Sequence, residues 1–426
     1  MLRPTLIELS HRLASGDTTS RALVEASLGR IADPSGEGAR AFLTVYAERA
    51  RAEADAVDAA RKRGEALPRF TGIPLAIKDL FDVEGEPTRA GSKALADAPP
   101  ATADADVVAR VRGAGFVILG KANMTEFAFG ALGLNPHYGT PLSPWDRACG
   151  RIPGGSCRIP AAFCGIVGMK PTQARVSLKG VLPLAPSLDS VGPFADSVAC
   201  CAALDDVLSG GLGDVEQPPP LPRLTIGLVE GYVDEGLDHA VASAFAAARK
   251  RLAKAGAKLM PVTLPELAEL PHVYRNGSMV EFEAFATHRR WLETRGELYD
   301  PWVRARLEAG REKKPADYIE LTLARARIRA ALDAKTRVFD ALALPTVPIA
   351  PPAIGDLGDI PASRALNALI LRNTSLANFL DRPAISIPCH TPGEAPVGFM
   401  LMGETGLDRR LLAVAQSVEA AARGEL

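Results

Sequence analysis

The chain has 426 residues, which is long enough for one large α/β domain or for two domains of ordinary size. Its 49 basic and 50 acidic residues leave a formal net charge of −1, which argues against a nucleic-acid-binding or membrane-surface protein. The N-terminal segment lacks the order of a signal peptide, and no apolar run is long enough to span a membrane. We therefore expect a cytoplasmic protein.

Helices are predicted at the start of the chain. The first begins after Thr5, with Glu8 placed for a capping box and Gly16 as a stop signal. A second helix is predicted over 19–31, and an alanine-rich helix with mixed charge over 47–66. The charged face of this third helix is interpreted as a solvated surface.

Short apolar strands and glycine turns begin near residue 70 and alternate with helices, a pattern typical of an α/β domain. In chain order we predict a strand within 72–83, a helix within 104–115, a strand over 116–121, a strand over 223–230, a helix over 239–254, a strand over 257–264, a helix over 316–339, a strand within 340–352 and a helix over 408–424. The proline-rich stretch 210–222 is predicted to be a connector inside one domain, because neither side looks self-sufficient.

Several familiar catalytic motifs are absent from the sequence. It has no GxxxxGK[ST] loop, no GxGxxG after a strand, no HExxH metal motif and no GxSxG nucleophile elbow. The six histidines are interpreted as surface or packing residues, because none has an acidic neighbour in a turn that suggests a dyad. The six cysteines form no CxxC pair and are predicted to be buried free thiols. No metal or cofactor is expected.

A lysine base and a serine nucleophile are the remaining catalytic candidates. Lys78 lies in the apolar stretch GIPLAIKDLFDV, and burial lowers the pKa of a lysine so that it can accept a proton. The alternative is a structural ion pair between Lys78 and Asp79 or another buried acid. Gly154 and Gly155 precede Ser156 and would let backbone N–H groups point at one oxyanion, although Gly-Gly-Ser also fits a simple turn.

These segments together resemble the amidase signature family. The stretch GIPLAIKDLFDVEG (72–85) is similar to its lysine strand, GGSCRIPAAFCGIVGMKPT (154–172) to its nucleophile block, and SLDSVGPFADSV (187–198) to the segment that follows. Further similarity lies in 110–130, 343–352, 378–389 and 396–403. The resemblance therefore covers nearly the whole chain.

The resemblance implies a fold. It is that of a single α/β domain over 1–426, with a central mixed β-sheet covered by helices on both faces. Residues 72–200 would form the signature core, and 223–340 the variable substrate-side region. Substrate identity in this family is set by loops and by that later region.

The resemblance also implies a reaction. Members hydrolyse a carboxamide or related C–N bond through a Ser-Ser-Lys triad, in which a neutral lysine draws a proton from the nucleophilic serine through a bridging serine. By motif position Lys78 is the lysine and Ser156 the nucleophile, and Gly154 and Gly155 would contribute to the oxyanion hole. A small-molecule amide is the expected substrate.

The chain departs from the family at the bridging serine. The family pattern has two Gly-Gly-Ser blocks separated by a small-residue helix and a strand, whereas this chain has one block. The simplest account is an internal deletion that joined the two blocks, so that one core helix and one strand are missing. Ser143, Thr140 and Ser92 are candidates to replace the bridging hydroxyl, or belong to ordinary turns. Arg158 is expected to have lost an acidic partner.

Two other functions stay open at this stage. In the first, the chain is a catalytically inactive, truncated relative or scaffold subunit. In the second, it is the glutaminase subunit of a tRNA-dependent amidotransferase. A homodimer or a complex with a small partner subunit is possible in each case. Trp291, Trp302 and Tyr318 either line a pocket or pack in the core, as aromatic residues at helical positions usually do.

Overall fold

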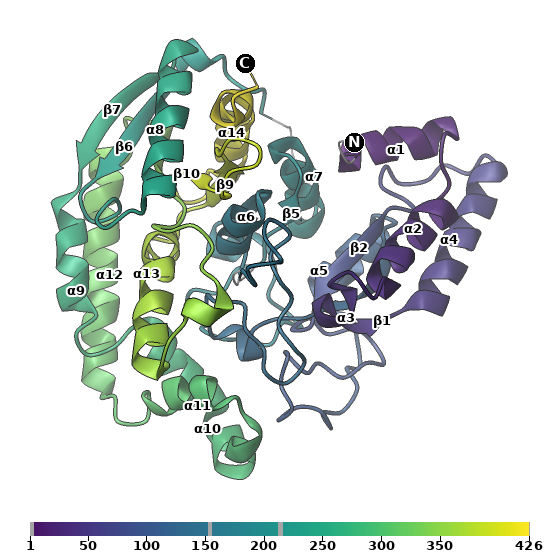
Figure 1. The fold of residues 1–426 in the computed structure, drawn as a ribbon, viewed down its shortest axis with the longest axis horizontal. Helices are drawn as coiled ribbons and strands as arrows, with labels where there is room; N and C mark the ends of the chain where they lie inside the picture. The colour runs from purple at the N-terminus through teal and green to yellow at the C-terminus, as the bar shows by residue number, and fades with distance from the viewer. Residues whose placement is uncertain (1–3, 152–155, 212–215, 426) are drawn as a thin grey trace.

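The structure, a computed structural model, describes residues 4–151, 156–211 and 216–425. Figure 1 shows a large helix-covered sheet on one side of the molecule and a smaller sheet with the N-terminal helices on the other. No described helix is long and apolar enough to cross a membrane.

The N-terminal part contains the smaller sheet, whose strand order is β1-β3-β2. Its elements are α1 (Leu6–Ser15), α2 (Ser20–Ala32), α3 (Gly38–Ala41), β1 (Phe42–Val45), α4 (Ala47–Lys62), β2 (Pro74–Lys78), α5 (Asp106–Gly113) and β3 (Val117–Ala122). The predicted capping box of α1 is confirmed: the Glu8 N–H donates to Thr5 Oγ1 (3.2 Å), and the Thr5 N–H donates to Glu8 Oε2 (2.6 Å).

The rest of the chain builds a seven-stranded mixed sheet of order β5-β4-β9-β10-β8-β6-β7. Its elements are α6 (Arg158–Cys164), β4 (Val167–Lys170), β5 (Phe194–Ala195), α7 (Val198–Ser209), β6 (Thr225–Glu230), α8 (His239–Lys254), β7 (Lys258–Thr263), α9 (Leu270–Val273), α10 (Met279–Arg295), α11 (Pro301–Glu308), α12 (Pro315–Thr336), β8 (Ala341–Pro345), α13 (Ile360–Phe379), β9 (Ala384–Pro388), β10 (Gly398–Met402) and α14 (Asp408–Arg423). Strand β6 runs parallel to β7 and β8, and the other pairs are antiparallel.

Helices cover both faces of this sheet, as predicted. Successive side chains of a strand point to opposite faces. In β8, Ala341 and Ala343 belong to the core that includes α8 and α14, whereas Leu342 and Leu344 belong to the core that includes α12 and α13. The α/β fold class with a large mixed sheet is therefore confirmed.

The two sheets each end in an open edge. Strand β2 is the last strand of the smaller sheet, β5 is the first of the larger one, and no strand pairing joins them in the described parts of the chain. Strand β5 has only two residues, and its Phe194 is 42% exposed. Residues on both edges border the same cavity. The predicted loss of one strand and one helix would leave a gap of this kind.

Candidate active site

A cavity of about 1210 Å³ extends between the edges of the two sheets. Lys78 at the end of β2 and Ser156 before α6 both line it, so the structure places the two predicted catalytic residues in one cavity. Gly154 and Gly155, the predicted oxyanion residues, lie outside the described residues.

Lys78 is held on β2 by parallel pairing with β3, in which it lies opposite Ala122. Protein surrounds its amine, and burial lowers the Lys78 pKa, although part of the side chain faces the cavity. Its amine makes no hydrogen bond to any residue that the structure describes. Asp79 is turned away, accepting the Gly91 N–H (2.9 Å) and lying 3.9 Å from the Lys121 ammonium. The alternative of a Lys78–Asp79 ion pair is therefore wrong.

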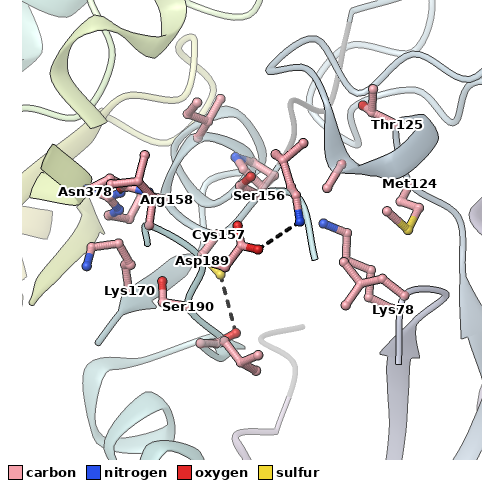
Figure 2. Close-up of a pocket in the computed structure, with 18 of the residues that line it drawn as sticks. Lys78, Met124, Thr125, Ser156, Cys157, Arg158, Lys170, Asp189, Ser190 and Asn378 are labelled. Atoms are coloured by element: carbon pink, nitrogen blue, oxygen red, sulfur yellow. Dashed lines mark hydrogen bonds between the residues drawn. The ribbon is translucent and has the colours of Figure 1, made fainter. Parts of the chain in front are cut away.

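Asp189 is a half-buried acid that faces Lys78 (Figure 2). Its carboxylate accepts backbone N–H groups from Leu184 (2.8 Å) and Ala185 (3.0 Å). Burial raises the Asp189 pKa, while these N–H groups and Lys78 act in the opposite direction. Our sequence interpretation assigned no role to Asp189, because it is more than one hundred positions from Lys78. The motif SLDSVGPF was the one available signal.

Ser156 adopts a left-handed backbone conformation, with φ of 65°, directly before α6. A non-glycine residue pays about 1–3 kcal/mol for this conformation, and such strain clusters at functional sites. The Ser156 hydroxyl makes no hydrogen bond within the described residues, and the side chain is exposed. Lys78 and Ser156 therefore share a cavity without a direct hydrogen bond.

Arg158, the first residue of α6, is buried among neutral acceptors. It donates to the Thr374 carbonyl (3.0 Å) and to the Asn378 side-chain oxygen (2.6 Å). Burial lowers the pKa of Arg158 to about 10. No carboxylate pairs with it in the described chain, and the loss of an acidic partner stays a prediction.

Lys170, at the end of β4, is a second buried lysine on this cavity. Its amine donates to the Pro171 carbonyl (2.8 Å), and burial together with the nearby Arg158 lowers its pKa to about 7. Figure 2 shows Lys170 on the opposite side of Cys157 from Lys78. The sequence interpretation missed Lys170, although GMKPT placed a lysine in an apolar strand just as GIPLAIKDLF did.

The three candidate replacements for the bridging serine lie away from the cavity. Ser143 donates to the Phe163 carbonyl (3.1 Å), and Thr140 accepts the Asn135 N–H (3.0 Å). Ser92 donates to Glu126 (2.6 Å). None of the three lines the cavity that holds Lys78 and Ser156. They make local structural contacts instead.

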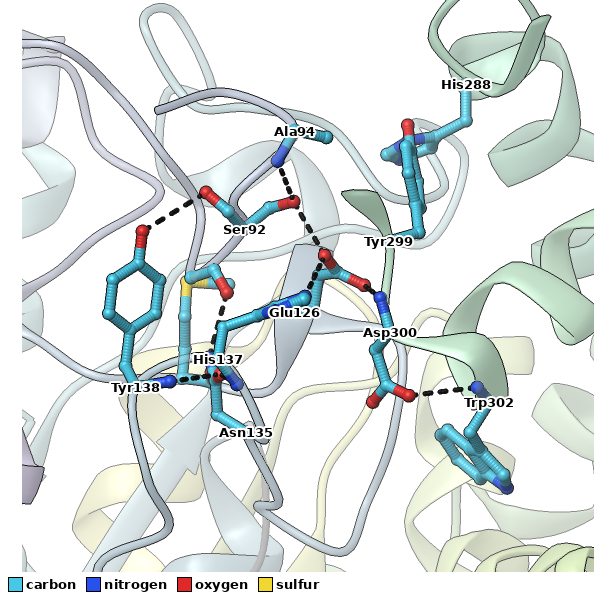
Figure 3. Close-up of polar contacts among 12 residues, drawn as sticks. Ser92, Ala94, Glu126, Asn135, His137, Tyr138, His288, Tyr299, Asp300 and Trp302 are labelled. Carbon is cyan, nitrogen blue, oxygen red and sulfur yellow. Dashed lines mark hydrogen bonds and ion pairs between the residues drawn. The ribbon is translucent and has the colours of Figure 1, made fainter. Parts of the chain in front are cut away.

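Histidine does acquire an acidic partner through the tertiary structure, contrary to the sequence interpretation (Figure 3). The His137 Nε2 atom lies 2.9 Å from the same Glu126 oxygen that accepts the Ser92 hydroxyl, and the Asp300 N–H donates to the other oxygen (2.8 Å). The carboxylate lies between the serine and the histidine, so the histidine cannot take the serine proton directly. We interpret this cluster as structural.

The structure also places the three aromatic residues that the sequence left between a pocket and the core. Trp291, Trp302 and Tyr318 pack against the hydrophobic cores and do not line the cavity.

The cysteines are free, as predicted, but Cys149 is exposed, and Cys157 and Cys164 are half-buried. The expectation of buried thiols is therefore wrong for these three.

Comparison with known proteins shows the family of this chain. The family model described as Amidase matches residues 22–156 and 148–412, two segments that both include 148–156. A 2-amino-5-chloromuconic acid deaminase from Comamonas testosteroni is 31% identical over 449 positions, covering 98% of this chain and 96% of the relative. One glutamyl-tRNA(Gln) amidotransferase chain, from Synechococcus sp. (strain WH7803), is 34% identical over 478 positions, covering 98% and 97%.

A solved structure described as an amidase superposes on this chain with a TM-score of 0.86. The two sequences are 32% identical, and the superposition covers 98% of this chain and 99% of that structure. Fold, site and similarity together define an enzyme of the class that hydrolyses C–N bonds. The chain belongs to the amidase family, also called the amidase signature family.

Proposed function

We propose that this chain hydrolyses a carboxamide or a related C–N bond of a small molecule, with Ser156 as the nucleophile and Lys78 as the base. The observation that carries the proposal is the Lys78 amine, which is enclosed in the cavity that Ser156 lines and has no hydrogen-bond partner among the described residues. Burial lowers the Lys78 pKa and favours the neutral amine, which is the form that accepts a proton.

In the proposed reaction Lys78 takes the Ser156 proton directly or through water, and the serine oxygen attacks the carboxamide carbon. The Lys78 ammonium then gives a proton to the leaving amine, and water hydrolyses the ester. Backbone N–H groups of Gly154 and Gly155 are proposed to hold the oxyanion.

Activity is proposed to be impaired, because the bridging hydroxyl is missing. Three observations support this: the family model matches 148–156 twice, the alignments with relatives exceed the 426 residues of this chain, and two sheet edges lie open. General acid–base relays contribute about 10²- to 10⁴-fold to rates. A direct transfer from Ser156 to Lys78 would forgo part of this factor.

The 223–340 region is proposed to select the substrate. Four residues of this region line the cavity: Tyr232, Tyr274, Met279 and Arg306. They supply aromatic, apolar and cationic surface, and so support a small organic amide.

The test is a panel of small amides and a fluorophosphonate probe, applied to the wild type, Ser156→Ala and Lys78→Met. We expect kcat to fall at least about 100-fold in each variant, and probe labelling to disappear in Ser156→Ala. Ser27→Ala is the matched control, because its hydroxyl bonds only to the carbonyl of Leu23 in its own helix. Wild-type labelling in Ser156→Ala would exclude Ser156 as the nucleophile.

The alternative of a catalytically inactive scaffold subunit is supported by the same three observations. It predicts no turnover on the amide panel by the purified chain. Turnover that depends on Ser156 or Lys78 would exclude it.

A glutaminase subunit is the other alternative, favoured by the 34% identity to a glutamyl-tRNA(Gln) amidotransferase chain over nearly the whole length. It predicts co-purification with partner chains and release of ammonia from glutamine. Purification of the chain alone, with activity on other amides but not on glutamine, would argue against it. In either case the expected partners would be a homodimer mate or a small subunit.

A further inference from the structure

Cys157 places a thiol beside the proposed base. It follows Ser156, directly precedes α6, and lines the same cavity as Lys78. Its thiol donates to the carbonyl of Gly192 at 3.4 Å. In Figure 2 the Lys78 side chain reaches from the opposite wall toward Asp189 and the Cys157 sulfur. The amine and the thiol thus line the same part of the cavity, with the Asp189 carboxylate beside them.

The groups around this thiol come from several elements. Burial raises the Cys157 pKa above that of an ordinary thiol, and Lys78 from β2, Arg158 from α6 and Lys170 from β4 act in the opposite direction. Cys201 on α7 is the buried thiol behind it, and Asp189 faces Lys78. These positive groups would stabilise a thiolate once it forms.

We propose that Cys157 is a second nucleophile of this cavity and that Lys78 is the base that takes its proton. A thiol loses its proton far more readily than a serine hydroxyl, and the resulting thiolate attacks carbonyl carbon strongly. A base that lacks the bridging serine therefore suits Cys157 better than it suits Ser156. The identity of the substrate rests on the proposed amide hydrolysis, but the reactivity of the thiol does not.

Lys78 and water supply and accept every proton that the proposed reaction transfers. The Lys78 amine takes the thiol proton, sulfur bonds to the carboxamide carbon, and the C–N bond breaks as Lys78 returns that proton to the leaving nitrogen. Water then attacks the thioester, the C–S bond breaks, and one proton of the water returns to sulfur through Lys78. The net change is hydrolysis of an amide to an acid and an amine.

The first test needs no substrate. Iodoacetamide alkylation is followed by peptide mass spectrometry between pH 6 and 9 in the wild type, Lys78→Met and Lys78→Arg. We expect Cys157 to react at least tenfold faster in the wild type than in Lys78→Met. Lys78→Arg should retain fast alkylation, because arginine keeps the positive charge although it cannot accept a proton.

Other thiols of the chain control this measurement. Alkylation of exposed Cys149 shows that the reagent is active. Buried Cys200 and Cys389 stay unlabelled only while a variant is folded. Half-buried Cys164, whose pKa burial raises to about 11, is the reference for a thiol on which no lysine of the described residues acts. A Cys157 that reacts no faster than Cys164, and is unaffected by Lys78→Met in folded protein, would overturn the proposal.

The second test uses any amide that the wild type hydrolyses. We expect Ser156→Ala to keep residual turnover that falls at least a further tenfold in Ser156→Ala/Cys157→Ala, and an acid-quenched acyl adduct on Cys157. Equal turnover in the single and double variants, with no adduct, would refute the thiol as nucleophile while leaving the proposed function intact. If the wild type hydrolyses no amide, the proposed function fails, and the alkylation experiment still decides the reactivity of the thiol.

Discussion

Three buried cations gather around the start of α6 without a carboxylate ion-pair partner in the described residues: Lys78, Arg158 and Lys170. Buried charges in proteins are normally paired, because desolvation disfavours the charged form. Arg158 instead uses neutral oxygens, and both lysines have a lowered pKa. Arg158 thus places positive charge at the site, and burial shifts both lysines toward the neutral amine, the form that accepts a proton.

Lys170→Met should remove a pH dependence of stability. The folded pKa of Lys170 is about 7, below the unfolded value of 10.5, so the folded state binds fewer protons between these values and stability rises with pH. Well above pH 7 the slope approaches about 1.4 kcal/mol per pH unit. We expect urea unfolding of the variant between pH 6.5 and 8.5 to lack this slope.

Lys62→Met, at the exposed end of α4, is the matched control and should keep the wild-type slope. Parallel pH profiles of the wild type and Lys170→Met would show that Lys170 does not titrate in this range.

At the scale of elements, close packing of α6 against β4 positions the proposed nucleophiles. Gly168 of β4 allows this approach: a Cβ atom there would lie 2.6 Å from the Ala161 Cβ and 2.8 Å from the Cys157 carbonyl oxygen. The second of these atoms belongs to the backbone next to Ser156. The position of both proposed nucleophiles therefore depends on a glycine in the neighbouring strand.

Gly168→Ala should destabilise the protein by about 1–3 kcal/mol, because it overpacks the contact between α6 and β4. It should also lower fluorophosphonate labelling of Ser156, since the start of α6 must shift. Thermal unfolding and labelling at a temperature where the variant is folded measure the two effects.

Gly113→Ala at the end of α5 is the control, because nothing lies within 4 Å of the added Cβ. It should be neutral or slightly stabilising. If the two variants are equally stable, the contact between α6 and β4 is not tight.

At the scale of the whole molecule, the open edges of β2 and β5 border one cavity between the two sheets. Unpaired sheet edges and a large cavity are both unfavourable for a folded domain. The sequence prediction of a lost strand would account for both unpaired edges. We propose that the segment predicted to be deleted would lie between Lys78 on β2 and Ser156 before α6.

Reinsertion of a family segment tests this arrangement. The helix and strand of a relative, with Gly-Gly-Ser restored on both sides, are inserted at 154–156. We expect the melting temperature to rise by several degrees, because a filled cavity and paired edges stabilise the fold. Amide hydrolysis should rise by about 100-fold or more as the bridging hydroxyl returns.

A Gly/Ser linker of equal length is the matched control. It adds chain without a strand or a bridging serine and should change neither quantity. If the family segment and the linker behave alike, a deletion does not explain weak activity.

The sequence alone determined the α/β class, the family and the local elements. Helix α1 followed from Thr5, Glu8 and Gly16, and the proposed base and nucleophile followed from two motifs. These signals are readable because caps, turns and periodic apolar residues act between positions a few residues apart.

Only the tertiary structure decided which distant groups meet. It brought Asp189 to Lys78, joined His137 to Glu126, placed Cys157 and Lys170 on the cavity, and left the strands in two sheets. None of these is encoded in local spacing, because packing of elements far apart in the chain sets both the contacts and the burial that shifts each pKa.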